Sequence, residues 1–495
     1  MAILDPNKDF HVVARAAIEK NSSQFAGVQR PLENVRYELE MPLQLNPDED
    51  PLPCRETPEE TAEISKIFSA QLHALYAEVA SFQARSLASI EEANLAPIDG
   101  EKGLAVHVTI GGQSFDIYPH CHHRLYHARR LTLQDPETLP TLPFVHKLRI
   151  LTANNHDNPY HFGRARPISL RVPLECLVRL PSATEINCPW LWERMPIAVG
   201  GRTERHYTRL WEGPWRDARH EFGAAVEELD QRIPATLTKA KLYFFRARAL
   251  ADEDHSRVMP NLVYPAARDP VSLGLRTLAT KLEELSLRAF ITDDLFPPPE
   301  APWSRMRRLY IEFHPFRPDG SWYFDGPDGK NPHPQGFIVS DEHYPPHRDT
   351  PEDKEIDEEW NYHPSADCGE PQPDMFRTEP VTDKIEPLIS AFASAVKNMG
   401  ALEEAELFTY LWWYPAENRE HVVGEPFPDT SDEGVYKWGL RYVSGNAAGK
   451  GSVQWQVGAW RPSQDVMMLF EELGEQEYLD FEKQERRRIK QDFLE

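Results

Sequence analysis

The segment Thr280–His314 contains two copies of one short pattern: Leu-Glu-Glu-Leu-Ser-Leu at residues 282–287 and Met-Arg-Arg-Leu-Tyr-Ile at residues 306–311. Each copy has one apolar residue, two charged residues, and then two apolar residues separated by one position. This alternation is typical of a chain that enters a β-strand. A run with apolar residues at helical spacing, 271–282, precedes the first copy. The segment therefore predicts a helix followed by two strands that share one buried face.

The spacing of the two copies, which begin at residues 282 and 306, lies in the range of leucine-rich repeats. Further copies preceded by a helical run or a Leu-Pro pair begin at Ala128, Val145, Ala183, Leu237 and Leu402. The intervals between copies are irregular. We therefore predict an α/β fold, an irregular leucine-rich-repeat-like solenoid with a helical N-terminal region and an acidic, proline-rich insertion.

The net charge, the apolar runs and the cysteine count argue against several classes of protein. The 495-residue chain carries a net charge of −25, which opposes binding to nucleic acid or to anionic lipid. No apolar run approaches the ~20 residues of a membrane span, and the N-terminus has no signal-peptide pattern. Five widely spaced cysteines fit a reducing compartment, so we expect a cytoplasmic or nuclear protein without a disulfide framework.

The clearest expected helix runs from Thr57 to about Asn94. Thr57 is a good N-cap, and an apolar seam at Phe68, Leu72, Leu75, Val79 and Phe82 favours packing on the body of the protein over dimerisation. Other expected elements are hairpins at 106–117 and 435–460, helices at 217–233, 384–399 and 471–495, and a strand at 405–411.

We expect five regions, which differ in composition and periodicity. They are an irregular segment with the long helix (1–100), the first part of the repeat body (101–316), an acidic proline-rich surface insertion (317–380), the end of the repeat body with a tryptophan-rich cap (381–470), and a charged terminal helix (471–495).

Histidines provide the best candidates for chemistry. His120, His123 and His127 lie close together, and His123 and His127 have the i, i+4 spacing that can bind one zinc ion on a helix. A polar turn is the simpler interpretation, because no second ligand cluster has zinc-finger spacing. The insertion adds His333, His343, His347, His363 and Cys368, where a solvated loop is again the simpler interpretation. The loop 445–452 lacks the phosphate-loop spacing. We therefore expect no catalytic residue and no cofactor.

Aromatic residues concentrate near the C-terminal end. Exposed aromatics beside arginines are typical anchors of protein interfaces, so we predict a partner-binding set. Its alternative is a cap that closes the repeat core. The set comprises Trp412, Trp413, Tyr414, Trp438, Trp455 and Trp460.

The chain resembles the large group of fungal F-box-like, leucine-rich-repeat-like proteins over roughly residues 124–470. The resemblance rests on the segments 142–150 (LPFVHKLRI), 180–186 (LPSATEI), 321–327 (SWYFDGP), 391–405 and 457–462 (VGAWRP). It implies a curved α/β repeat body that holds a partner protein, and family members with an F-box dock to Skp1 in a ubiquitin ligase. The Leu-Pro-x-Glu signature of an F-box is absent from the N-terminal region of this sequence.

We therefore expect a non-enzymatic interaction scaffold or adaptor, with Skp1 or a ubiquitination substrate as partner. The alternative is a metal-dependent hydrolase that uses His120, His123 and His127 or the histidines of the insertion.

Overall fold

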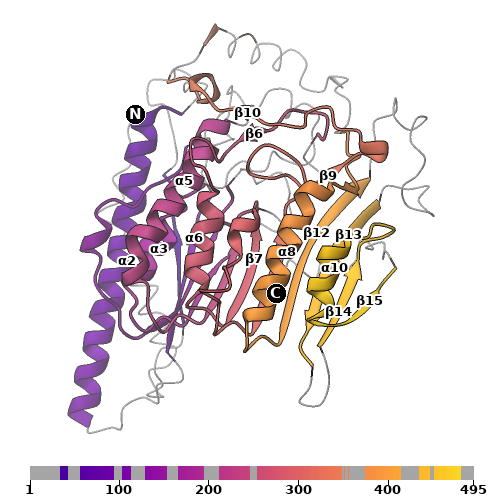
Figure 1. Ribbon diagram of the computed structural model, residues 1–495. Helices are drawn as coiled ribbons and strands as arrows, with labels where there is room; N and C mark the ends of the chain where they lie inside the picture. The colour runs from indigo at the N-terminus through magenta and orange to yellow at the C-terminus, as the bar shows by residue number, and fades with distance from the viewer. Residues whose placement is uncertain are drawn as a thin grey trace. The chain divides into compact units, whose positions relative to one another are not determined.

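The computed structural model describes residues 34–42, 56–93, 103–112, 129–152, 166–193, 211–245, 254–347, 350–351, 355, 374–413, 434–445 and 451–480. The chain divides into two compact units, Met1–Leu242 with Glu342–Cys368 and Tyr243–Asp341 with Gly369–Glu495. Figure 1 shows that each unit combines helices with a mostly parallel set of strands. The predicted α/β class is confirmed.

In the part of the first unit that the structure describes, five parallel strands follow in sequential order, β1-β2-β3-β4-β5. Sequential parallel order requires a crossover after every strand, as the helical runs between the strands predict. The strands are β1 (Asn34–Leu39), β2 (Leu104–Ile110), β3 (Val145–Thr152), β4 (Glu185–Cys188) and β5 (Lys239–Tyr243), and the described helices are α2 (Pro58–Ala93), α3 (Val172–Leu177) and α5 (Glu212–Leu229).

Helix α2 confirms the first predicted helix. Thr57 Oγ1 accepts a hydrogen bond from the Glu60 backbone N–H (3.2 Å), and the Glu60 carboxylate accepts one from the Thr57 backbone N–H (2.9 Å). This reciprocal pair is a capping box. The seam residues from Phe68 to Val79 are at most 2% exposed, and Phe82 is half-buried. The seam is therefore buried within the protein, as predicted.

The hairpin predicted at residues 106–117 is wrong for its first arm. Residues 104–110 form β2, which pairs in parallel with β1 on one side and β3 on the other. An antiparallel return arm would need one of these two edges. Residues 113–117 lie outside the described part of the chain.

The described residues of the second unit form six neighbouring strands in the order β7-β8-β12-β13-β14-β15. β12 and β14 run antiparallel to β13, and the other neighbours are parallel. The strands are β7 (Glu284–Ala289), β8 (Arg308–Phe313), β12 (Glu404–Trp413), β13 (Gly434–Val443), β14 (Gly451–Gln456) and β15 (Gly474–Tyr478), and the helices are α6 (Pro270–Ala279), α8 (Thr382–Asn398) and α10 (Gln464–Glu471). Two short pairs complete it, β6 (Pro260–Asn261) with β10 (Phe337–Ile338) and β9 (Phe324–Asp325) with β11 (Glu379–Pro380).

The pattern copies stack in register within each unit. Leu285 of the first copy pairs with Leu309 of the second, and Leu309 pairs with Ala405 of the copy that begins at Leu402. In the first unit, Leu148 pairs with Ile186, which pairs with Ala240. Corresponding positions of successive copies therefore lie side by side, whatever the length of chain between them.

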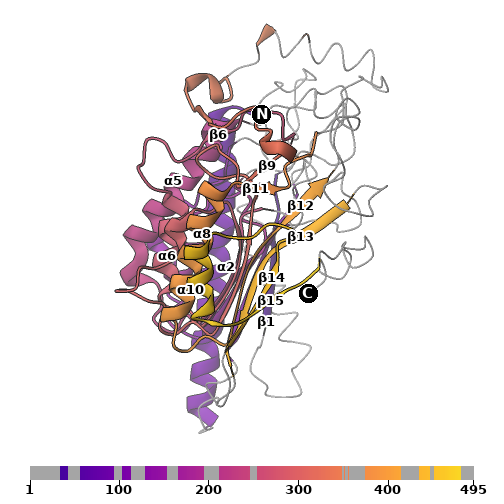
Figure 2. The same cartoon turned by 45° about the vertical axis from the view of Figure 1, so that its right-hand side comes forward.

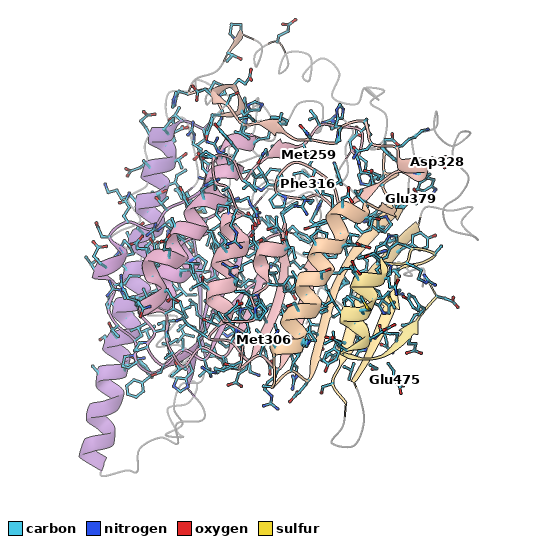
Figure 3. All side chains as sticks on the ribbon, in the orientation of Figure 1. Met259, Met306, Phe316, Asp328, Glu379 and Glu475 are labelled. Carbon is cyan, nitrogen blue, oxygen red and sulfur yellow. The ribbon has the colours of Figure 1, made fainter. Side chains whose placement is uncertain are left out.

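These stacked positions form the core. Leu309 and Ile311 are fully buried, as is Met306, the first residue of the second copy (Figure 3). Each such side chain contributes about 1.5–3 kcal/mol when fully buried. The copy at Ala128 differs, because Leu131 forms only an isolated bridge with Ile168 instead of a strand.

Most of the remaining predicted elements are confirmed, and one is wrong. Helices α5 and α8, strand β12 and the β13–β14 hairpin are confirmed. The predicted terminal helix at 471–495 is wrong at its start, because α10 ends at Glu471 and β15 follows. Residues 481–495 lie outside the described part.

The predicted surface insertion contains core residues. Trp322, Tyr323 and Phe324 are at most 1% exposed, and Phe376 is also buried. The two short strands β9 and β11 bring the ends of this segment together. Burial of three consecutive large aromatics would not occur in a solvated loop, so this part of the segment is core instead. Separately, no helix in the described ranges is long and apolar enough to cross a membrane.

Candidate protein-interaction surface

The sheet of the second unit has one face covered by helices. In Figure 2, α6, α8 and α10 lie on the same side of strands β12–β15. Side chains alternate along β12 between fully buried and half-buried positions, as expected when only one face packs on helices. None of the described helices of this unit lies on the other side, which we call the open sheet face. It carries Glu284, Ser286, Arg288, Arg308, Tyr310, Glu312, Glu404, Glu406, Phe408, Tyr410, Trp412, Val435, Lys437, Arg441, Ser452, Gln454, Glu475 and Glu477.

Charged side chains on the open sheet face pair across neighbouring strands. Glu404 accepts hydrogen bonds from Tyr310 Oη (2.8 Å) and from Arg441 Nε (2.6 Å). Lys437 Nζ donates to Glu406 Oε1 at 2.5 Å. Cross-strand pairs of this kind hold side chains in fixed positions. The middle of this face therefore presents ordered polar groups.

Arg288 and Tyr310 have shifted acidities. Burial lowers the pKa of Arg288, but the nearby Glu312 carboxylate outweighs it, so the pKa is raised and Arg288 stays charged. Its guanidinium donates to Glu312 Oε2 at 2.7 Å and lies 4.0 Å from the centre of the Tyr243 ring. Burial, together with the hydrogen bond to Glu404, raises the pKa of Tyr310 to about 12. Both groups therefore keep one protonation state near neutral pH.

Strand β12 contributes an aromatic stripe, Phe408, Tyr410 and Trp412, at every second position. All three are half-buried. The Phe408 and Tyr410 rings meet edge to face with centroids 5.7 Å apart, and Lys437 Nζ lies 4.2 Å from the centre of the Phe408 ring. Tyr and Trp are enriched among the residues that contribute most to protein binding, and an ammonium group is attracted to the face of an aromatic ring.

Gly439 lies opposite Phe408 in the register of β12 and β13. A Cβ at Gly439 would lie 2.5 Å from the Leu407 carbonyl oxygen and 2.6 Å from the Phe408 Cβ. A glycine is therefore required where the aromatic stripe crosses β13.

Three predicted partner-binding residues are not available to a partner. Trp413, Trp438 and Trp455 are at most 7% exposed, and Trp455 packs edge to face on Phe470 of α10 with centroids 4.6 Å apart. The prediction that these three are exposed anchors is wrong, because burial removes their rings from solvent. Their burial agrees with the alternative, a cap that closes the core.

The other three members have different positions. Trp412 is half-buried on the open sheet face, on the opposite side of β12 from Trp413, as strand alternation predicts. Trp460 is half-buried and contacts Trp438 with centroids 5.8 Å apart. Tyr414 lies outside the described residues. Partner binding by Trp412, Trp460 and Tyr414 stays a prediction.

Tyr310, Phe408, Tyr410 and Lys437 were not among the residues predicted to bind a partner. Strand alternation could have indicated them, because the apolar positions of β7, β8 and β12 were assigned to the core. The alternate positions of the same strands then belong to the other face. What the sequence could not show is which of the two faces the helices cover.

Most of the residues considered for metal binding lie outside the described parts of the chain, so the structure does not test them. His120, His123 and His127 lie outside the described residues, as do His363 and Cys368. Within the described ranges, no group of three or more His, Cys, Asp or Glu residues could hold a metal ion.

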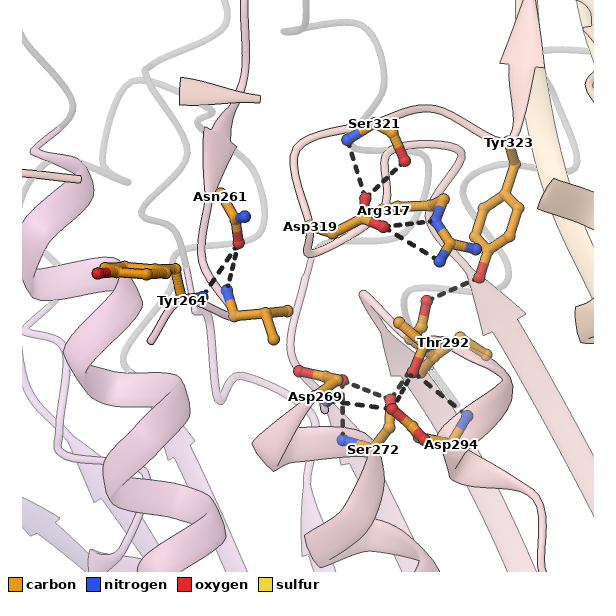
Figure 4. A network of polar contacts seen from close by, with 12 residues as sticks. Asn261, Tyr264, Asp269, Ser272, Thr292, Asp294, Arg317, Asp319, Ser321 and Tyr323 are labelled. Carbon is orange, nitrogen blue, oxygen red and sulfur yellow. Dashed lines mark hydrogen bonds and ion pairs between the residues drawn. The ribbon is translucent and has the colours of Figure 1, made fainter. Parts of the chain in front are cut away.

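A buried polar network lies at the ends of β7 and β8 (Figure 4). It contains a serine hydrogen-bonded to an aspartate, a pair of residue types that also occurs in active sites. Ser272 Oγ donates to Asp269 and accepts from the Thr292 backbone N–H (3.0 Å). Asp269 also accepts from the Ser272 N–H and thereby caps α6. Both Ser272 and Asp269 are at most 1% exposed. The network therefore joins a helix start to a strand end and offers no accessible nucleophile.

Nearby, Tyr323 donates from Oη to the Ile291 carbonyl (2.9 Å), and the Arg317 guanidinium lies 4.8 Å from the centre of the Tyr323 ring (Figure 4). Burial raises the pKa of Tyr323, so its hydroxyl remains a donor. These contacts hold the segment after β8 against the segment after β7.

The open sheet face is therefore the best-defined candidate site. Comparisons of this chain with protein-family models, curated proteins and solved structures found no match.

Proposed function

We propose that this chain is a non-enzymatic protein-interaction scaffold or adaptor, and that a partner protein binds its open sheet face. The observation that carries the proposal is the aromatic stripe of β12, half-buried and flanked by Lys437 and by the Tyr310–Glu404–Arg441 contacts. Tyr, Trp and Arg side chains dominate the binding energy of protein interfaces. These groups are held in place before binding, which lowers the entropy lost on association.

The body that carries this face is, in our proposal, an irregular leucine-rich-repeat-like solenoid. The in-register stacking of the pattern copies supports it, since stacked strands with returns on one side are the construction of such repeats. In these architectures the exposed strand face binds the partner, and the variable length of the returns is accommodated on the other side.

The resemblance to F-box-like proteins extends the proposal to substrate recognition in a ubiquitin ligase. In this extension, the surface of the long helix α2 that does not pack on the protein would dock to Skp1. This extension is tested separately: purification from cells that contain Skp1 and cullin should recover both proteins, and recovery of other partners alone would leave a scaffold without a ligase link.

The main test compares partners recovered by affinity purification and mass spectrometry. We would use the full-length chain and the variant Tyr410→Ser/Trp412→Ser. Phe144→Ser in the first unit is the matched control, because Phe144 is an exposed aromatic (42%). We expect the double variant to lose a protein that the wild type and control retain. Thermal unfolding would confirm that all three proteins fold, and Lys437→Ala would provide a second, milder change. Equal recovery by all variants would overturn the assignment of the face.

A further inference from the structure

Strand β15 forms an edge of the sheet in the second unit. It is the last strand in the order and pairs with β14 alone among the described strands. An edge strand presents backbone N–H and C=O groups that can pair with another strand. Figure 3 shows Glu475 of β15 at the outer side of this unit.

The edge carries carboxylates that have no cation beside them in the described part of the chain. Glu475 and Glu477 are exposed and lie on the open sheet face, two positions apart. Glu477 accepts a hydrogen bond from Gln454 Nε2 (3.0 Å), a neutral group. By contrast, the carboxylates in the middle of this face are paired with Arg or Lys. Negative charge is thus neutralised at the centre of the open sheet face and left over at its edge.

Exposed apolar groups also gather at this edge. Among the described residues, seven large apolar side chains are exposed, and two of them lie at this edge: Tyr478 (37%), the last residue of β15, and Leu479 (39%), which follows it. Charges on an edge strand alone would be read as protection against aggregation. Exposed apolar side chains beside that edge are the opposite of protection and are typical of an interaction surface.

We propose that β15 receives an extended, positively charged segment of a partner protein, which adds to the sheet as a further strand. Backbone pairing would supply affinity, and side chains at alternate positions would supply specificity, as in other cases of strand addition. Since Glu475 and Glu477 are two positions apart, the segment has Lys or Arg at every second position, with apolar residues between them on the side of Tyr478.

This inference rests on the proposed function only in that the chain binds a protein. A second copy of the chain is the less suitable occupant, because each copy has a net charge of −25 and two copies repel each other.

The test uses three fluorescein-labelled dodecapeptides and full-length protein. The first has lysine at every second position with valine or threonine between. The second has the same composition with the lysines in one block. The third has glutamate in place of lysine. We expect the first to bind at least ten-fold more tightly than the second, and the third not to bind.

Protein variants complete the test. Glu475→Gln/Glu477→Gln should weaken binding of the first peptide at least ten-fold. Glu300→Gln/Glu379→Gln removes the same number of exposed charges from this unit and should leave binding unchanged. Equal binding of the first two peptides, or equal loss in both variants, would show non-specific attraction and overturn strand addition.

Two further measurements would identify other occupants of the edge. Tighter peptide binding by a chain that ends at Asp480 would assign the edge to residues 481–495. A dimer by sedimentation that the Glu475→Gln/Glu477→Gln change disrupts would assign it to a second copy. Either result, or no binding of any peptide, overturns the proposal. The partner-recovery experiment with Tyr410 and Trp412 is independent of all of these outcomes.

Discussion

Arg377 donates two hydrogen bonds to His255 in the core of the second unit. The His255 Nδ1 accepts from the Arg377 backbone N–H (3.0 Å), and Arg377 Nε donates to the His255 carbonyl (3.1 Å). The same Nδ1 also accepts from the Phe376 backbone N–H (2.9 Å). His255 is 2% exposed and Arg377 is fully buried. Because Nδ1 acts as an acceptor, this histidine must be neutral in the folded protein.

The first prediction concerns pH. Burial, and then the charge of Arg377, holds the pKa of His255 well below its ordinary 6.5. Below pH about 6.5 the unfolded chain therefore binds a proton at His255 that the folded protein does not. The free energy of unfolding is unaffected by His255 above this pH and decreases as the pH falls below it. The loss should reach about 2 kcal/mol at pH 5.

Urea unfolding at pH 7.5 and pH 5 would measure this loss. His255→Gln should be less stable at pH 7.5 but should show a smaller decrease toward pH 5 than the wild type. His333→Gln, a half-buried histidine outside this contact, should keep the wild-type slope. An unchanged slope in His255→Gln would show that other groups cause the pH dependence.

The second prediction tests the close approach of β12 and β13. Gly439→Ala would place a methyl group against the Leu407 carbonyl and Phe408, both of which are held by the sheet. We expect a loss of about 1–3 kcal/mol in the free energy of unfolding. Gly400→Ala is the control, because nothing lies within 4 Å of its added Cβ. Equal thermal stability of the two variants would argue against this packing.

The third prediction concerns a buried ion pair in the first unit. Arg219 donates to Glu193 Oε2, and both side chains are fully buried. Arg219→Met leaves a buried carboxylate without its main partner and should cost about 3–5 kcal/mol. The double variant Arg219→Met/Glu193→Gln removes both charges and should recover much of that loss. Lys397→Ala breaks the exposed pair with Glu472 and should cost less than about 1 kcal/mol. Denaturant titrations would measure all three, and additive effects at Arg219 and Glu193 would contradict the pairing.

The fourth prediction uses the alternation of β8. Leu309 is fully buried, whereas its neighbour Arg308 is exposed. Leu309→Ala should cost about 2–5 kcal/mol through lost contacts and a residual cavity. Arg308→Ala should change the free energy of unfolding by no more than about 0.5 kcal/mol. Comparable losses at the two positions would mean that β8 does not present alternate faces to core and solvent.

The sequence predicted the strands that follow a repeated pattern and the helices with a clear apolar face. Strand alternation and helix periodicity are local properties, so β7, β8, β12 and the helices α2, α5 and α8 could be assigned from neighbouring residues alone. The sequence also predicted that Trp412 and Trp413 face opposite ways, for the same reason.

The features that the sequence did not predict depend on packing between segments far apart in the chain. Residues 104–110 read as one arm of a hairpin, but parallel neighbours from distant segments, β1 and β3, occupy both of their edges. Residues 321–324 read as part of a surface insertion, but they are buried because β9 and β11 bring the two ends of that segment together. Which face of the sheet the helices leave open, and hence that Phe408, Tyr410 and Lys437 lie together, depends on contacts between residues far apart in the chain. Pairing and burial of this kind are set by the summed free energy of many distant contacts, which no single stretch of residues encodes.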